Sequence, residues 1–221
     1  MNDTIQIAID GPVGVGKSTV AREVARRLQI IYLDTGAMYR AVGLKSLRLG
    51  IDVDDEQALQ NLLQHTQLEV RNIDGVMHMV LDGEDVSDLI RTPEVSMAAS
   101  DVSRWPQVRT ALVALQQRLA AGMSVVMEGR DIATVVLPGA QHKFFLVADV
   151  QARAQRRALD MRAAGRMVDM QVLTQEIQRR DTQDSTRETS PLRCAPDARK
   201  IDTTALTFEE VVAEILKDID R

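Results

Sequence analysis

The stretch that most constrains this chain is GPVGVGKS at residues 11–18, because it matches the pattern GxxxxGK[ST] of a phosphate-binding loop, or P-loop. Glycines allow the backbone NH groups of such a loop to curl around a phosphate, and the following helix adds partial positive charge. The pattern is informative only between a strand and a helix. Segment 4–9 has the apolar composition of a strand, and a helical apolar stripe begins after Lys17. We therefore expect a nucleotide site rather than a structural turn.

The residue types in this loop indicate how it would hold a nucleotide. The ammonium group of Lys17 would bridge the terminal phosphates, and the hydroxyl of Ser18 would help to hold a magnesium ion. The backbone of the neighbouring residues would supply the NH donors. The residues expected to bind the nucleotide are Gly11, Pro12, Val13, Gly14, Val15, Gly16, Lys17, Ser18 and Thr19.

Segments that read as strands alternate with helical segments along the chain. Segments 124–127 and 144–147 are short and continuously apolar, as strands covered on both faces are. Two long helical stretches follow, near 150–164 and 169–188. This alternation predicts an α/β fold with a mainly parallel central sheet flanked by helices.

Shorter patterns predict the other elements. Pro93 and Pro106 are expected to begin helices, since a missing backbone donor costs little at that position. Thr207 and Glu210 form a capping box at the start of the last helix. The remaining segments are a strand at 30–33, a helix from about 37 to 50, a helix at 56–63, strands at 68–70 and 76–81 joined by a turn at 72–75, and a strand near 201.

Charge is distributed unevenly along the chain. Residues 51–90 include ten acidic residues and one basic residue, whereas residues 151–200 have a net charge of +4. A polyanionic ligand would therefore bind the second of these segments. We expect the acidic stretch to form a small α+β subdomain, 41–90, inserted into a core of 1–40 and 91–221.

The composition of the whole chain argues against several classes of protein. A formal net charge of -5 argues against a basic surface for nucleic acid. No segment reads as a signal peptide or approaches membrane-spanning length. The single cysteine, Cys194, cannot form an internal disulfide and suits a reducing cytosol. We expect a soluble, monomeric, cytoplasmic protein with small-molecule partners.

A P-loop by itself leaves three classes open: a kinase for a small acceptor, a GTPase switch, and an ATP-binding module with a conformational output. The guanine-reading pattern NKxD is absent from the sequence, which argues against the switch. A kinase needs a second anion site. Arginines are plentiful near the expected carboxyl ends of strands, where ligands of such sheets bind, and the planar, permanently charged guanidinium suits phosphate oxygens.

Three further motifs, together with the P-loop, carry a resemblance to a known family. They are DTGAMYR at 34–40, GRDIATVVLP at 129–138 and RRDTQDSTR at 179–187. With these motifs and the acidic stretch, the sequence resembles the bacterial cytidylate kinases over essentially the whole chain. The resemblance implies transfer of a phosphoryl group from ATP, with Mg²⁺, to CMP or dCMP. It also implies that the acidic insert at 41–90 binds the acceptor nucleotide and that a helical lid lies at about 153–170.

The resemblance also implies roles for individual residues. The P-loop residues would bind ATP. The residues that would bind the acceptor phosphate are Thr35, Arg40, Arg130 and Arg187. Those that would read the base are Ser100, Arg109 and Asp131, and those that would contact the ribose are Arg180 and Asp184. Arg153 and Arg157 would contact ATP as the lid closes. The catalytic set would be Lys17, Arg130, Arg153, Arg157 and Arg187.

Two positions depart from the pattern of the family. Glu128 stands where many relatives carry aspartate, and two roles stay open for it: it orients magnesium through water, or it is a structural carboxylate at the end of a strand. Ala133 replaces a glycine that is common in this segment, which should only narrow the local backbone freedom.

The chemistry of cytosine agrees with the role implied for Asp131. Cytosine offers an amino donor beside acceptors, so a carboxylate next to an arginine complements it. Uracil has a carbonyl in place of that amino group, so we expect CMP to be preferred over UMP. The rivals are another small-molecule kinase on this scaffold, such as a broader UMP/CMP kinase or a shikimate-like kinase, and a non-enzymatic ATP-binding module.

Overall fold

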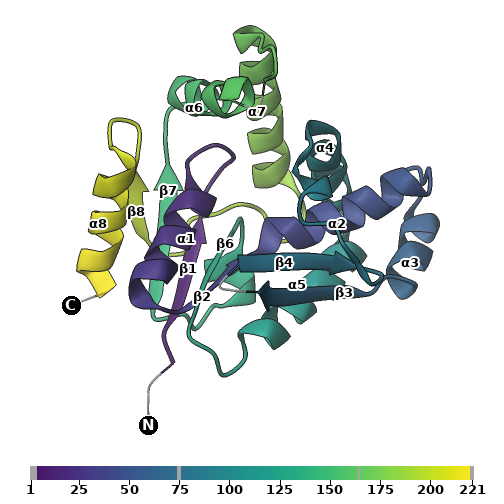
Figure 1. Cartoon of the computed structure of the whole chain (residues 1–221), viewed down its shortest axis with the longest axis horizontal. Helices are drawn as coiled ribbons and strands as arrows, with labels where there is room; N and C mark the ends of the chain where they lie inside the picture. Colours follow the sequence, from purple (N-terminus) through teal and green to yellow (C-terminus); the bar gives the residue numbers. More distant parts are fainter. Residues whose placement is uncertain (1–3, 74–75, 164, 220–221) are drawn as a thin grey trace. The chain divides into compact units, whose positions relative to one another are not determined.

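The structure is a computed structural model that describes residues 4–73, 76–163 and 165–219 (Figure 1). The chain divides into two compact units. The P-loop unit comprises Met1–Tyr32 and Met123–Arg221, and the intervening unit comprises Leu33–Gly122.

A five-stranded sheet forms the centre of the P-loop unit, in the order β2-β6-β1-β7-β8. β1 pairs in parallel with β6 and with β7, and β7 pairs in parallel with β8. These pairings confirm the mainly parallel sheet expected from the sequence. The strands are β1 (Gln6–Asp10), β2 (Ile31–Asp34), β6 (Val125–Gly129), β7 (His142–Val147) and β8 (Arg199–Asp202).

The helices of the P-loop unit follow the predicted order. Among the described residues they are α1 (Lys17–Leu28), the short π-helical segment η2 (Ile132–Val136), α6 (Val150–Ala163), α7 (Met170–Thr186) and α8 (Phe208–Ile219). The sequence patterns predicted all of these except η2. The capping box before α8 is confirmed: the backbone NH of Thr207 donates to the Glu210 carboxylate at 2.8 Å, and the Glu210 NH donates to the Thr207 hydroxyl at 3.3 Å.

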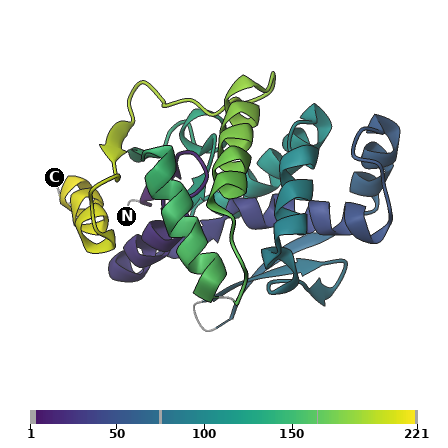
Figure 2. The same ribbon diagram turned by 90° about the horizontal axis from the view of Figure 1, so that it is seen from above.

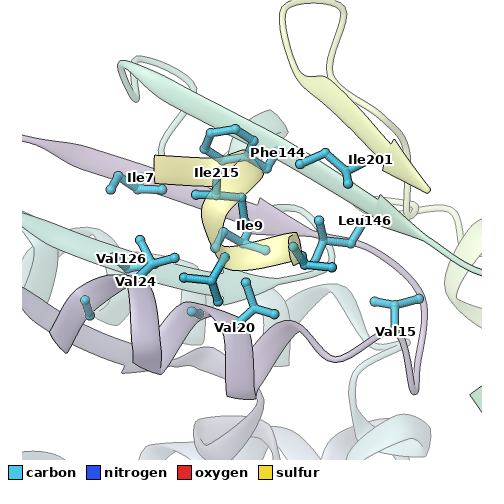
Figure 3. Packing of buried hydrophobic residues seen from close by; sticks show 14 residues of the cluster. Ile7, Ile9, Val15, Val20, Val24, Val126, Phe144, Leu146, Ile201 and Ile215 are labelled. Carbon is cyan, nitrogen blue, oxygen red and sulfur yellow. The ribbon is translucent and has the colours of Figure 1, made fainter. Parts of the chain in front are cut away.

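The large apolar cluster of the P-loop unit lies on one face of the sheet. Ile7 and Ile9 are two residues apart in β1 and so point to the same face, where both are fully buried. Helices α1 and α8 lie side by side (Figures 1 and 2) and contribute to the same core. Burying each of these aliphatic side chains stabilises the fold by about 1.5–3 kcal/mol. Figure 3 shows the cluster, whose labelled residues are Ile7, Ile9, Val15, Val20, Val24, Val126, Phe144, Leu146, Ile201 and Ile215.

The intervening unit contains helices and a small antiparallel sheet of three strands, in the order β3-β4-β5. The sequence predicted β3 and β4 but not the short β5 or η1. The predicted turn at 72–75 falls partly on residues 74 and 75, which lie outside the described residues. The elements are α2 (Thr35–Arg48), α3 (Glu56–Gln64), β3 (Leu68–Ile73), β4 (Val76–Leu81), β5 (Glu84–Asp85), η1 (Leu89–Arg91), α4 (Pro93–Val102) and α5 (Pro106–Ala120).

The intervening unit is larger than the acidic insert expected at 41–90. One apolar cluster explains the difference, because it joins hairpin residues such as Met79 to Met38 of α2 and to Val108 and Leu112 of α5. The hairpin by itself has too few strands to bury a core, so it shares one with α2, α4 and α5. The unit therefore runs from Leu33 to Gly122. Acceptor binding by segment 41–90 stays a prediction.

Helices α2 and α4 pack closely at Gly43. A Cβ atom at this position would lie 2.8 Å from the backbone nitrogen of Ala99 and 3.0 Å from the backbone carbon of Ala98. These separations are shorter than ordinary van der Waals contacts, and the neighbouring atoms belong to the backbone. A side chain at residue 43 would therefore force the two helices apart.

We expect Gly43→Ala to lower the free energy of unfolding by about 1–2 kcal/mol, since overpacking costs about 1–3 kcal/mol and the higher helix propensity of alanine returns up to about 1 kcal/mol. Urea denaturation would measure the change. Gly139→Ala is the matched control, because a Cβ atom there has no neighbour within 4 Å. Equal stabilities of the two variants would show that the contact between α2 and α4 tolerates a methyl group.

Candidate active site

The P-loop of this chain joins β1 to α1, which is the context that its sequence pattern requires. Gly11 has φ 151°, and a Cβ atom there would collide with the carbonyl oxygen of Leu146 in β7. Gly16 has φ 92° and caps α1, which begins at Lys17. Both positions therefore need glycine, and the loop can present its NH groups at the start of a helix.

Lys17 is the buried cation of this loop. Its side-chain ammonium donates to the carbonyl oxygen of Pro12 at 2.7 Å, and the residue is only 5% exposed. Burial, and then the positive charge of Arg130, lowers the pKa of Lys17 to about 7. An anion placed next to Lys17 would favour its charged form, so the site is suited to phosphate.

Ser18 and Glu128 meet beside the start of α1. Glu128 pairs with Ile9 in the sheet and shares its face, which is the face that α1 covers. The Ser18 hydroxyl donates to Glu128 Oε1 at 2.6 Å, and the Tyr32 hydroxyl donates to the same oxygen at 3.3 Å. A hydroxyl and a buried carboxylate supply the hard oxygen ligands that Mg²⁺ prefers. The arrangement fits a magnesium ion bound together with phosphates.

Arginines and carboxylates form a buried network between the end of β6 and α7. Arg130 Nε donates to Asp184 Oδ2 at 2.7 Å. Arg187 lies 3.6 Å from Asp184 and 3.8 Å from Asp131. Burial would raise the pKa of Asp184, but the charges of Arg130 and Arg187 outweigh it and lower this pKa below the usual range. The network thus holds two arginines and two carboxylates of the predicted acceptor site together.

Arg180 adds further positive charge to this network. Burial, and then the charge of Arg130, lowers the pKa of Arg180 to about 10, and Arg157 contributes in the same direction. Arg180 Nε is buried and has no hydrogen-bond partner among the described residues. An anion bound beside Arg180 would favour its charged form. Arg130, Arg157 and Arg180 therefore form a cationic cluster suited to a polyanion.

Arg153 is placed differently from Arg157, the other predicted lid arginine. Its Nη1 and Nε atoms donate at 3.0 Å to the backbone carbonyl oxygens of Val13 and Ala148, and its Nη2 atom lies 2.6 Å from Asp181. All three nitrogens of the guanidinium therefore contact protein groups. Arg157, one helical turn later, has no such set of contacts among those described and remains half-buried.

The intervening unit holds the other predicted acceptor residues. Asp34 caps α2 through the backbone NH of Ala37, at 3.0 Å, and its second oxygen accepts from Arg40 at 2.6 Å. A Cβ atom at Gly36 would lie 3.0 Å from Arg40 Nη1, so glycine allows the arginine to fold back over the helix start. Thr35 is buried beside them. Thr35 and Arg40 are thus brought to one helix N-terminus, which favours anions.

Arg109 and Ser100 lie buried in the same unit. Arg109 is 2% exposed, which makes it one of the largest fully enclosed side chains in the described chain. Its guanidinium lies 5.4 Å from the centre of the Tyr39 ring, a cation–π distance. The Ser103 hydroxyl donates to the Ser100 carbonyl oxygen at 2.8 Å. Asp131, the third predicted base-reading residue, belongs to the P-loop unit.

Sequence reasoning missed Asp10, which immediately precedes the P-loop. Its two carboxylate oxygens accept from the backbone NH groups of Ile132 and Ala133 at 2.9 Å and 2.8 Å. These bonds tie the start of η2, and with it the Arg130-Asp131 segment, to the end of β1. Burial raises the pKa of Asp10 to about 6, although the two hydrogen bonds favour its charged form. The sequence does contain a signal for this role, because Asp10 is an acidic residue at the end of an apolar strand.

No group of three or more His, Cys, Asp or Glu side chains within 4–73, 76–163 and 165–219 is placed to hold a metal ion. No helix in the described part of the chain is long and apolar enough to cross a membrane.

Comparisons with known proteins agree with these features. The family model for cytidylate kinase matches residues 7–221. A cytidylate kinase from Geobacillus kaustophilus (strain HTA426) is 50% identical over 220 residues, which cover 100% of this chain and 98% of the relative. A cytidylate kinase from Caldicellulosiruptor bescii is 50% identical over 213 residues, which cover 96% of this chain and 94% of the relative.

Solved structures of other kinases share the fold. A gluconokinase from Sinorhizobium meliloti 1021 has a TM-score of 0.50 at 18% identity and covers 98% of this chain and 92% of its own. A shikimate kinase from Bacteroides thetaiotaomicron has a TM-score of 0.50 at 13% identity, with coverages of 98% and 99%. This likeness concerns the α/β fold alone. The match over nearly the whole length, by the family model and by relatives at half identity, shows that the chain belongs to the cytidylate kinase family.

Proposed function

We propose that this protein transfers the terminal phosphoryl group of ATP to CMP or dCMP and so forms CDP or dCDP and ADP. The observation that carries the proposal is a buried P-loop lysine in the same unit as buried arginines, with the pKa values of Lys17 and Arg180 lowered by burial and by the charge of Arg130. Two polyanionic nucleotides would supply negative charge that favours the charged forms of these groups. Membership of the cytidylate kinase family supports CMP as the acceptor.

On the donor side, the P-loop residues and Lys17 would bind the phosphates of ATP. Ser18 and Glu128 would hold Mg²⁺, with Glu128 acting through water, and the metal would supply neutralisation of phosphate charge. Ser18 already donates to the Glu128 carboxylate, so binding of the ion would require the hydroxyl to turn. Glu128 could orient Mg²⁺ through water and also act as a structural carboxylate at the end of β6, so the two roles are compatible.

On the acceptor side, the roles come from the resemblance to the family. The residues that would bind the phosphate of CMP are Thr35, Arg40, Arg130 and Arg187. The base would be read by Asp131, Ser100 and Arg109. The ribose would be bound by Arg180 and Asp184, which the network on α7 holds in the P-loop unit.

The chemistry requires alignment more than proton transfer. The acceptor phosphate is already an anionic nucleophile, so no general base is obligatory. Lys17, Arg130, Arg187 and Arg157 would neutralise the repulsion between the two nucleotides. Exclusion of water by the lid would prevent hydrolysis of ATP. A cytoplasmic location and a monomeric state stay predictions from the sequence.

A coupled assay of ADP release tests the proposal against its rivals. The acceptors to compare are CMP, dCMP, UMP, AMP and shikimate, each with ATP and Mg²⁺. We expect rapid turnover with CMP and dCMP. Turnover with shikimate alone would indicate a different small-molecule kinase, and slow ATP hydrolysis unaffected by any acceptor would indicate an ATP-binding module.

Lys17→Met should lower kcat by about 100-fold or more, because it removes a cation aimed at the charge that develops in transfer. The coupled assay measures kcat, and circular dichroism checks that the fold is retained. Lys200→Met is the control, since Lys200 is exposed in β8 and should leave turnover unchanged. Near-normal turnover of Lys17→Met would contradict the assigned role.

Glu128→Gln should raise the Mg²⁺ concentration needed for half-maximal activity by about 10–100-fold, the usual effect of losing an outer-shell metal partner. Glu128→Asp keeps the charge on a shorter arm and should shift the requirement less. Titration of Mg²⁺ at saturating ATP and CMP measures both. An unchanged titration curve with reduced thermal stability would leave only the structural role for Glu128.

Asp131→Asn should reduce the preference for CMP over UMP by at least about 10-fold, because the amide can donate to the carbonyl that uracil carries where cytosine has an amino group. The ratio of kcat/KM for the two acceptors measures this preference. If the wild-type protein already used both acceptors equally, the assignment of Asp131 to the base would be wrong.

A further inference from the structure

Two consecutive carbonyl oxygens of the P-loop are held by cationic side chains. Lys17 Nζ donates to the Pro12 oxygen at 2.7 Å, and Arg153 Nη1 donates to the Val13 oxygen at 3.0 Å. A loop that wraps a phosphate must point NH groups inwards and carbonyl oxygens away, since those oxygens would repel the phosphate. Arg153 therefore satisfies an outward carbonyl of the loop.

Apolar packing reinforces this contact between the P-loop and the helices α6 and α7. Val13 packs against the buried cluster formed by Ala154 and Ala158 of α6 and by Leu173 and Ile177 of α7. A Cβ atom at Gly14 would lie 3.2 Å from the Cβ atom of Arg153, so the loop and α6 are already in close contact. In Figure 1 α6 lies next to the loop between β1 and α1. The tip of the loop thus belongs to the core of the helix pair.

The same arginine also joins the two helices to each other. Its Nη2 atom pairs with Asp181 of α7 at 2.6 Å, with side-chain exposures of 7% for Arg153 and 24% for Asp181. The other oxygen of Asp181 is buried and has no hydrogen-bond partner among the described residues. Loss of Arg153 would leave this carboxylate without its ion pair, which is costly for a shielded charge.

The ion pair lies in the helical turns that carry the cationic cluster. Arg157 follows Arg153 by one turn of α6, and Asp181 lies between Arg180 and Asp184 on α7. A shift of either helix would therefore move Arg157 or Arg180 relative to the P-loop. Misplacement of such groups by 1 Å costs about 100-fold in rate.

We propose that Arg153 is a positioning residue that fixes the P-loop to α6 and α7 through Val13 and Asp181, and not a ligand of ATP. The expected loss of kcat/KM on removing Arg153 rests on the function proposed above. The expected loosening of the P-loop and α7 does not. Three of the five N–H donors of Arg153 are committed to Ala148, Val13 and Asp181, and its side chain is only 7% exposed, so little of this guanidinium is open to a phosphate.

A double-mutant cycle tests the proposal through kinetics. Arg153→Met and Asp181→Asn should each lower kcat/KM for both ATP and CMP, by up to about 100-fold, and the double variant should be no worse than the more impaired single variant. Strong non-additivity is expected of groups that act as one unit. If Arg153→Met does not fold, Arg153→Lys replaces it, since one ammonium cannot contact three acceptors in this geometry.

Arg156→Met is the matched control. Arg156 is the next arginine along α6, but its guanidinium bonds to the Thr203 hydroxyl at 3.0 Å and does not reach α7 in the described structure. This variant should keep the kcat/KM values of the wild-type protein even if its thermal stability falls. Equal losses of kcat/KM in Arg156→Met and Arg153→Met would contradict the proposal, because the losses would then follow from lowered stability in general.

Amide hydrogen exchange without nucleotide provides a readout that does not depend on activity. Exchange of residues 14–16 and of α7 should be faster in Arg153→Met and in Asp181→Asn than in the wild-type protein or Arg156→Met. If the wild-type protein fails to phosphorylate CMP, the proposed function is wrong, and the exchange data still decide this proposal. If Arg153→Met impairs the use of ATP while Asp181→Asn changes neither kinetics nor exchange, Arg153 instead contacts the nucleotide directly.

Discussion

Concentrated positive charge at the carboxyl edge of a parallel sheet is the constraint on which the P-loop unit depends. Lys17 and Arg180 both have lowered pKa values because they are buried close to Arg130. Uncompensated burial of such charges is strongly destabilising. Glu128 and Asp184 offset part of the charge, and the remainder suits the site to phosphate. The sheet supports this arrangement with a core of aliphatic side chains on the face that α1 and α8 cover.

Local patterns predicted most of the fold. The strand before the P-loop, the helix after it, the proline starts of α4 and α5 and the capping box of α8 all depend on residues close together in the chain. Such patterns report the backbone preference of a segment directly. The motifs indicated which residues belong to the site, but they did not predict the hydrogen bonds of Ser18 with Glu128 and of Arg130 with Asp184, which lies in α7.

Contacts between distant segments explain what the sequence did not predict. Segment 41–90 reads as a separate acidic insert, yet Met79 shares a core with Leu112 of α5, and charge patterns carry no information about that packing. Arg153 has the spacing of a lid arginine, but its contacts with Val13 and Asp181 depend on how three segments fold together. The π-helical segment η2 depends on a carboxylate more than a hundred residues earlier, at Asp10.

The burial of Asp10 affects how the P-loop unit responds to acid. Its pKa of about 6 in the folded protein exceeds its ordinary value of 3.8, so the folded state binds more protons than the unfolded state between these values. The contribution of this group to stability therefore increases as pH falls through 6 and is complete below 3.8. The pKa of Asp184 is instead lowered from 3.8, so its contribution to stability is present above that value and is lost as pH falls below it. Acidification below 3.8 should thus weaken the arginine network anchored on α7, while the contribution of Asp10 to the strand that leads into the phosphate loop is retained.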